Sequence, residues 1–140
     1  MLFELPIHPQ LVHFPVALFI MAFLIELFGT LLRWPSLQTL AGQLYILGAV
    51  MTIPAVVTGY LEAQRLALNH PVLTAHRTYA YWTAGVSLSS LIALGFVHKK
   101  FPQYDRPVLR LFLIIVVILV ILTGHEGGEM VYEYGVGIQP

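Results

Sequence analysis

The stretch LFLIIVVILVIL, residues 111–122, contains twelve consecutive residues without a polar side chain. A helix needs about 20 predominantly apolar residues to cross the hydrocarbon core of a bilayer. Four segments of this chain are long and apolar enough, and they lie near residues 12–32, 40–61, 78–97 and 108–123. The sequence therefore predicts an all-α fold, an integral membrane four-helix bundle embedded in the lipid bilayer.

The composition agrees with a membrane protein and excludes several other classes. The chain has 140 residues, the length of one domain, and we treat 1–140 as a single four-helix transmembrane domain. Hydrophobic residues make up 58% and charged residues 10%, too few charges to cover a soluble globule. Seven Lys and Arg balance seven Asp and Glu, so no basic surplus indicates a nucleic acid partner. Because cysteine is absent, disulfides, thiolate metal sites, iron–sulfur clusters and covalently attached haem are excluded.

The distribution of cationic residues predicts how the helices are oriented. Five cations lie in or beside the first and third connections: Arg33, Lys99, Lys100, Arg106 and Arg110. Only Arg65 and Arg77 lie on the opposite side. The positive-inside rule then places both termini and the second connection outside the cytoplasm. We expect a multi-pass membrane protein, with the opposite side periplasmic or extracellular.

Two pairs of short matches indicate an internal duplication. A His-Pro step at 8–9 followed by His13 opens the first segment, and a His-Pro step at 70–71 followed by His76 opens the third. VTG at 57–59 ends the second segment and LTG at 122–124 ends the fourth. Copies of the same orientation predict two hairpins related by a pseudo-twofold axis along the membrane normal.

Histidines gather at one end of the predicted bundle. Five of the six lie at the same ends of the apolar segments: His8, His13, His70, His76 and His125. Imidazole is the commonest metal ligand and a usual axial ligand of haem iron, so this gathering suggests a bound cofactor. Each member of the pair His13 and His76 lies about one turn inside its helix, and the duplication places the two opposite each other across the axis. We therefore expect them to be the axial ligands of a haem b.

The other three histidines have secondary roles in this interpretation. His8 and His70 precede prolines, and they are alternative ligands or groups that orient His13 and His76 through hydrogen bonds. His125 has Tyr60 at its matching position in the repeat, so a site that uses His125 is asymmetric. The alternative for all five is a structural role, in which each imidazole anchors a helix at the headgroup level.

A non-haem metal ion is a second interpretation of the same region. The carboxylates of Glu62, Glu126, Glu129 and Glu133 belong to the same end of the bundle. With imidazoles, carboxylates can hold Zn, Cu, Mn or Fe. The ligand set for such an ion is His8, His13, His76 and His125 together with Glu129.

Glu26 is the one carboxylate deep within an apolar segment. An ionisable group in a membrane span is costly and is a candidate functional residue. Because Glu26 lies toward the cytoplasmic end, Arg33 or Arg110 could reach it. We interpret it as a structural ion pair or a protonated hydrogen-bonding acid rather than as a proton relay.

Two stretches resemble the signatures of a known family. HPQLVHFPVAL, residues 8–18, resembles the opening signature of the bacterial predicted membrane proteins called domain of unknown function 2231, and GGEMVYEYGVG, residues 127–137, resembles the closing one. His76 matches the internal histidine of that family. The resemblance implies four transmembrane helices, no assigned enzymatic activity, and relatives joined to Rieske or cytochrome-type modules. The family tail usually carries histidine where this chain has Tyr134, so the resemblance does not make that position a ligand here.

These observations lead to one leading hypothesis and two alternatives. The first is a membrane-embedded b-type haem protein or redox-complex subunit, which passes electrons between a quinol and a periplasmic cytochrome or Rieske-type protein. The second is a non-haem metal-binding membrane protein, and the third a cofactor-free structural or assembly subunit. The residues assign no catalytic activity. Small residues in the second and third segments would also allow a homodimer.

Overall fold

Four long helices form the part of the chain that the computed structural model describes, residues 7–65 and 70–135. They are α1 (Ile7–Leu31), α2 (Pro35–Arg65), α3 (Pro71–Lys100) and α4 (Asp105–Tyr132), and the short 3-10 helix η1 (Pro102–Tyr104) precedes α4. Each of the four is long and apolar enough to cross a membrane, and no strand occurs within 7–65 and 70–135. The predicted all-α four-helix membrane bundle is confirmed.

The helices extend beyond the predicted segments, most of all at the ends where the histidines lie. α1 begins at Ile7 rather than near 12, and α4 continues to Tyr132 rather than ending near 123. Apolar residues mark only the part of a helix that is in lipid, whereas a helix continues until a cap ends it. At the start of α3 the cap is His70, whose side chain accepts a hydrogen bond from the Val72 amide, with Pro71 in the first helical position.

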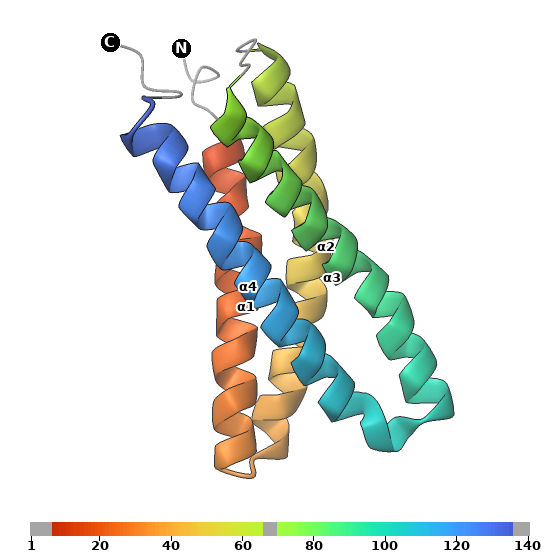
Figure 1. Cartoon of the computed structure of the whole chain (residues 1–140). Helices are drawn as coiled ribbons and strands as arrows, with labels where there is room; N and C mark the ends of the chain where they lie inside the picture. The colour runs from red at the N-terminus through yellow and green to blue at the C-terminus, as the bar shows by residue number, and fades with distance from the viewer. Residues whose placement is uncertain (1–6, 66–69, 136–140) are drawn as a thin grey trace.

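The helices pair as two hairpins that cross each other (Figure 1). α1 packs mainly against α2 and α3 mainly against α4, while smaller contacts between α1 and α4 and between α2 and α3 join the hairpins. α1 and α3 begin, and α2 and α4 end, at one end of the bundle, which we call the histidine end. The tight turns at 32–34 and 101–104 lie at the other, which we call the turn end.

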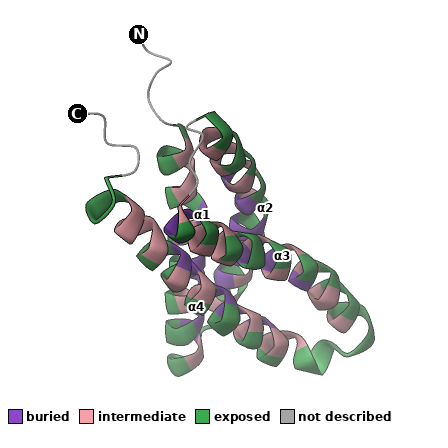
Figure 2. Cartoon of the chain, turned by 45° about the horizontal axis from the view of Figure 1, so that its top comes forward, coloured by how far each residue is buried: buried purple, intermediate pink, exposed green. Residues whose placement is uncertain are grey.

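A closely packed core lies where the hairpins cross. Its buried residues come from α1, α2 and α4: Phe19, Ala22, Tyr45, Ala49, Leu109, Leu113, Val116 and Val120. Gly48 lets α1 and α2 approach, because a Cβ there would lie 3.0 Å from the Phe19 ring. Figure 2 shows buried residues on the inner faces of the helices and exposed residues facing outward. Many of the exposed residues are large and hydrophobic, as expected of helix faces that contact lipid.

Hydroxyl groups inside the bundle add polar contacts between the hairpins and within one of them. The Tyr45 hydroxyl lies 2.6 Å from Ser90 Oγ and so links α2 to α3. Thr83 Oγ1 lies 3.4 Å from Thr123 Oγ1 and links α3 to α4. All four side chains are buried, and a buried polar group must find such a partner to avoid a large desolvation cost.

Candidate functional site

The imidazoles of His8 and His76 lie beside each other at the histidine end. Their ring centroids are 6.5 Å apart and their planes are nearly perpendicular, at 83°. His8 belongs to α1 and His76 to α3, so the contact joins the two hairpins. Both side chains are half-buried. This pair lies at the end of the bundle where the sequence predicted a cofactor between His13 and His76.

The hydrogen bond of His76 determines which ring nitrogen is free. His76 Nδ1 lies 3.0 Å from the carbonyl oxygen of Thr123 in α4. A carbonyl oxygen can only accept, so the Nδ1–H group donates. In the neutral imidazole the proton is then on Nδ1, and Nε2 keeps a lone pair that can bind a metal.

The same argument applies to His8. Its Nδ1 lies 3.3 Å from the hydroxyl oxygen of Thr58 in α2. The single hydroxyl proton of Thr58 is directed to its own helix, where the oxygen lies 2.8 Å from the carbonyl of Pro54 and 3.1 Å from that of Ala55. The hydroxyl oxygen therefore accepts from His8 Nδ1–H, and His8 Nε2 is also left with a lone pair.

Glycines make room for both rings. A Cβ at Gly59 of α2 would lie only 2.7 Å from Cε1 of His8, and one at Gly127 of α4 would lie 3.3 Å from Cε1 of His76. Gly124, which the sequence repeat matches to Gly59, would meet nothing within 4 Å. The glycine that serves His76 is therefore one turn further along α4 than the duplication indicates.

His8, and not the expected His13, is the ring that lies beside His76. His13 is exposed, and its Nδ1 donates to the carbonyl of Pro9 in its own helix. The reason is helical periodicity: His8 lies seven residues before buried Pro15, as His76 lies seven before buried Thr83, whereas His13 lies on a different face of α1. The duplication matches His13 to His76 because each is the second histidine of its copy. The second copy has one more residue between its two histidines, so the matched positions do not lie on the same face of their helices.

The remaining histidines make other contacts. His70 caps α3, and its ring centroid lies 4.4 Å from that of Tyr134. Exposed His125 has its Nε2 3.3 Å from Glu129 Oε1, one turn along α4. The last two residues of the tail signature, 136 and 137, lie outside the described residues.

Carboxylates lie near the two paired imidazoles. Glu62 is close enough to His8, and Glu126 to His76, for direct electrostatic interaction. Within 7–65 and 70–135, no three His, Asp or Glu side chains are arranged so that they could hold a metal ion. The arrangement therefore offers one pair of imidazole lone pairs with acidic side chains beside them.

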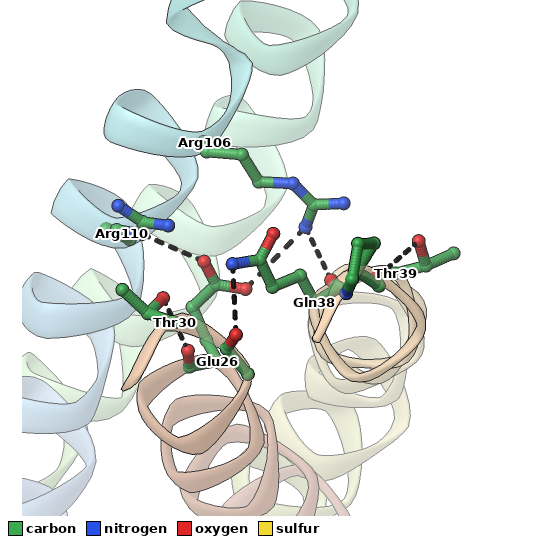
Figure 3. Close-up of polar contacts among 8 residues, drawn as sticks. Glu26, Thr30, Gln38, Thr39, Arg106 and Arg110 are labelled. Carbon is green, nitrogen blue, oxygen red and sulfur yellow. Dashed lines mark hydrogen bonds and ion pairs between the residues drawn. The ribbon is translucent and has the colours of Figure 1, made fainter. Parts of the chain in front are cut away.

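A second polar cluster lies at the turn end (Figure 3). The Glu26 side chain is only 4% exposed, and its Oε1 accepts a hydrogen bond from Arg110 Nε at 2.9 Å. Arg106 Nη1 lies 3.6 Å from Glu26 Oε2 and also donates to the Gln38 carbonyl. Gln38 in turn donates from Nε2 to the Gly29 carbonyl at 3.3 Å. The predicted ion pair of Glu26 is thus confirmed with Arg110, and Arg106 is an additional partner that the sequence did not indicate.

Comparison with known proteins identifies a family. A family model described as "Predicted membrane protein (DUF2231)" matches residues 4–140, which confirms the resemblance seen in the two signatures. No curated protein and no solved structure matches the chain.

Proposed function

The chain belongs to the DUF2231 family of predicted membrane proteins, and from this premise we propose that it is a b-type haem-binding electron-transfer protein or a subunit of a redox complex. One observation carries the proposal. Two imidazoles from different hairpins meet, and each has Nδ1 bound to an oxygen, while no hydrogen bond of either Nε2 is recorded within 7–65 and 70–135. Metal-binding histidines typically donate their other ring N–H to such an oxygen, which fixes the ring orientation.

We assign His8 and His76 as the axial ligands, with His8 in the position first expected for His13. Haem iron needs only one or two protein ligands, because the porphyrin supplies the other four. Metal–imidazole bonds are about 2 Å long, so two rings that share one iron must lie within a few ångströms of each other. The centroid separation of 6.5 Å between the two rings supports this pairing. A bound haem would supply one-electron chemistry, and the two histidines would hold and orient it between the hairpins.

The orientation that we propose for the protein in its membrane follows from the positions of its cationic residues. Five cations lie at or near the turn end, namely Arg33, Lys99, Lys100, Arg106 and Arg110. By the positive-inside rule this end faces the cytoplasm and the histidine end faces the periplasm of a bacterial inner membrane. Electrons would then pass from a quinol in the bilayer to a periplasmic cytochrome or Rieske-type protein.

A non-haem metal ion is the second candidate, and the carboxylates favour it. A tetrahedral ion needs four ligands. The carboxylates of Glu62 and Glu126 interact electrostatically with His8 and His76. Within 7–65 and 70–135 no three such side chains are arranged to hold an ion, so binding would require them to move together. Zn, Cu, Mn or Fe would suit such a donor set.

An absorption spectrum of the purified protein, expressed with a haem supply, distinguishes these functions. We expect a Soret band and, after reduction, sharp bands of a low-spin haem. His8→Ala and His76→Ala should each remove the haem, whereas His13→Ala, which alters an exposed histidine of the same helix, should retain it. Loss of haem in H13A but not in H8A would contradict our ligand assignment. A protein with stoichiometric metal and no Soret band would support the second candidate, and one with neither would leave a structural subunit.

A further inference from the structure

The ion cluster at the turn end carries more positive than negative charge. Arg106 and Arg110 contribute two guanidinium groups, and Glu26 contributes one carboxylate. The acid is almost completely buried, while the arginine side chains are 37% and 39% exposed. The carboxylate therefore neutralises the cluster only on its inner side, and one net positive charge faces the surroundings of the bundle.

The arginines also keep unused hydrogen-bond donors. A guanidinium group has five N–H bonds. Among the described residues, Arg110 uses its Nε for Glu26, and Arg106 uses one terminal nitrogen for Gln38 and Glu26. Within 7–65 and 70–135 the other donors make no recorded hydrogen bond, so they remain available to an acceptor from outside the chain. Phosphate oxygens match the planar fork of arginine and bind it in pairs.

Aromatic residues indicate that this cluster lies at the level of lipid headgroups. Trp34, Phe101 and Tyr104 are exposed at the two turns, and Trp and Tyr prefer the membrane–water interface. Arg106 follows Tyr104 by two residues. Large apolar side chains are exposed on the adjoining turns of α1 and α4: Leu27, Phe28, Leu31, Leu111 and Ile114. A ligand here would meet cations at one end and an apolar surface along the rest.

We propose that Arg106 and Arg110 bind the phosphate of an anionic phospholipid, whose acyl chains lie against the exposed apolar faces of α1 and α4. Basic sites between membrane helices are suited to such headgroups. Glu26 lies on the inner side of both guanidinium groups and competes with the phosphate for their positive charge. This lipid site is independent of the haem proposal, because it lies at the opposite end of the bundle.

Quenching of Trp34 by brominated lipids tests the proposal. The chain has two tryptophans, so W82F leaves Trp34 beside the cluster as the only reporter. In vesicles, brominated phosphatidylglycerol should quench Trp34 more effectively than brominated phosphatidylcholine, with a relative binding constant of about fivefold for each arginine engaged. In R106Q/R110Q the two lipids should quench equally. K99Q/K100Q, which removes two positive charges from the same end, is the matched control and should keep the preference.

Three outcomes would overturn the assignment. The first is equal quenching by the two lipids in the W82F protein, and the second is an equal loss of preference in K99Q/K100Q, which would indicate general surface charge. The third is displacement of the lipid by inorganic phosphate at constant ionic strength, which would indicate a site for a soluble anion.

One further variant decides the matter if R106Q/R110Q does not fold. Glu26→Gln keeps the shape and the acceptor for Arg110 but removes the competing negative charge. We expect it to increase the preference for the anionic lipid severalfold. An unchanged or weaker preference would contradict a phosphate site and leave the arginines as a purely structural clamp.

Discussion

At the scale of single residues, the candidate site depends on atoms that the imidazoles do not contribute themselves. Thr58 and Thr123 direct the Nδ1 protons of His8 and His76, and Gly59 makes room for the His8 ring. These neighbours come from α2 and α4, the second helix of each hairpin. Each hairpin therefore carries a complete unit, with a histidine on its first helix and a supporting oxygen on its second.

Adding a single methyl group tests this arrangement. Gly59→Ala would bring a Cβ within 2.7 Å of His8 Cε1, so the ring must move away from its position beside His76. We expect G59A to lose most of the bound haem while the helices stay folded, because the end of a side chain can move more easily than a backbone. The absorption of the Soret band per protein, alongside a circular dichroism melt, measures both effects.

Gly124→Ala is the matched control for that variant. Nothing lies within 4 Å of the added Cβ, and replacing a helical glycine by alanine stabilises a helix by about 1 kcal/mol. G124A should keep its haem and melt at the same or a higher temperature. Equal haem content in G59A and G124A would show that the His8 ring position is not important for binding.

At the scale of elements, the turn between α1 and α2 contains Arg33 in a backbone conformation that is unfavourable for a residue with a side chain. Arg33 has a φ of 52°, in the left-handed region that glycine adopts readily. Its amide donates to the Thr30 carbonyl at 3.2 Å and the Trp34 amide donates to the Gly29 carbonyl at 2.8 Å, which together form a Schellman motif. Glycine usually occupies the position of Arg33 in that motif, so arginine carries a backbone cost there.

Replacing Arg33 by glycine should therefore stabilise the fold. We expect Arg33→Gly to raise the free energy of unfolding by about 0.5–1 kcal/mol, since relief of the left-handed strain exceeds the added freedom of the unfolded chain. Arg33→Lys keeps both the Cβ and the charge and should leave stability unchanged. Thermal unfolding in detergent measures the difference, and a destabilised R33G would show that the arginine side chain makes a contribution larger than the strain.

Some features of these elements could be predicted from the sequence and others could not. The four spans were predicted because lipid requires long apolar helices. An ion pair of Glu26 with Arg33 or Arg110 was one of two predicted states, because a charge in a span needs a partner, and the structure has Arg110 in that place. The inward face of α1 was predicted wrongly. His13 was chosen because it is the second histidine of its repeat, whereas the 3.6-residue period of the helix places His8 on the inward face. Arg106 was missed because its approach to Glu26 depends on the crossing of the hairpins, which no local pattern specifies.

At the scale of the whole molecule, the two ends of the bundle differ in charge and chemistry. The histidine end holds the paired imidazoles, and the turn end holds the arginine cluster. Buried hydroxyls and a packed core separate them, with Tyr45 bonded to Ser90 where the hairpins cross. The proposed redox and lipid sites therefore use different leaflets of the membrane.

The orientation of the bundle can be measured directly, because the chain contains no cysteine. We expect a cysteine placed at exposed Gln64, at the histidine end, to react with a membrane-impermeant maleimide in intact cells that have a permeabilised outer membrane. A cysteine at exposed Gln103, between the last two helices, should react only after the inner membrane is opened. The reverse pattern would mean that the charges do not orient this protein and that the histidines face the cytoplasm.

The ion pair of Glu26 also has a consequence for how the protein is made. Its partner Arg106 comes eighty residues later in the chain, and at roughly 5–20 residues per second a ribosome needs roughly 4–16 s to reach it. During that interval Glu26 lacks the two arginines that it contacts in the folded bundle. Nascent chains should therefore stay with the insertion machinery until α4 has been synthesised. A product truncated before α4 would leave Glu26 without these partners, a feature by which membrane proteases could recognise it.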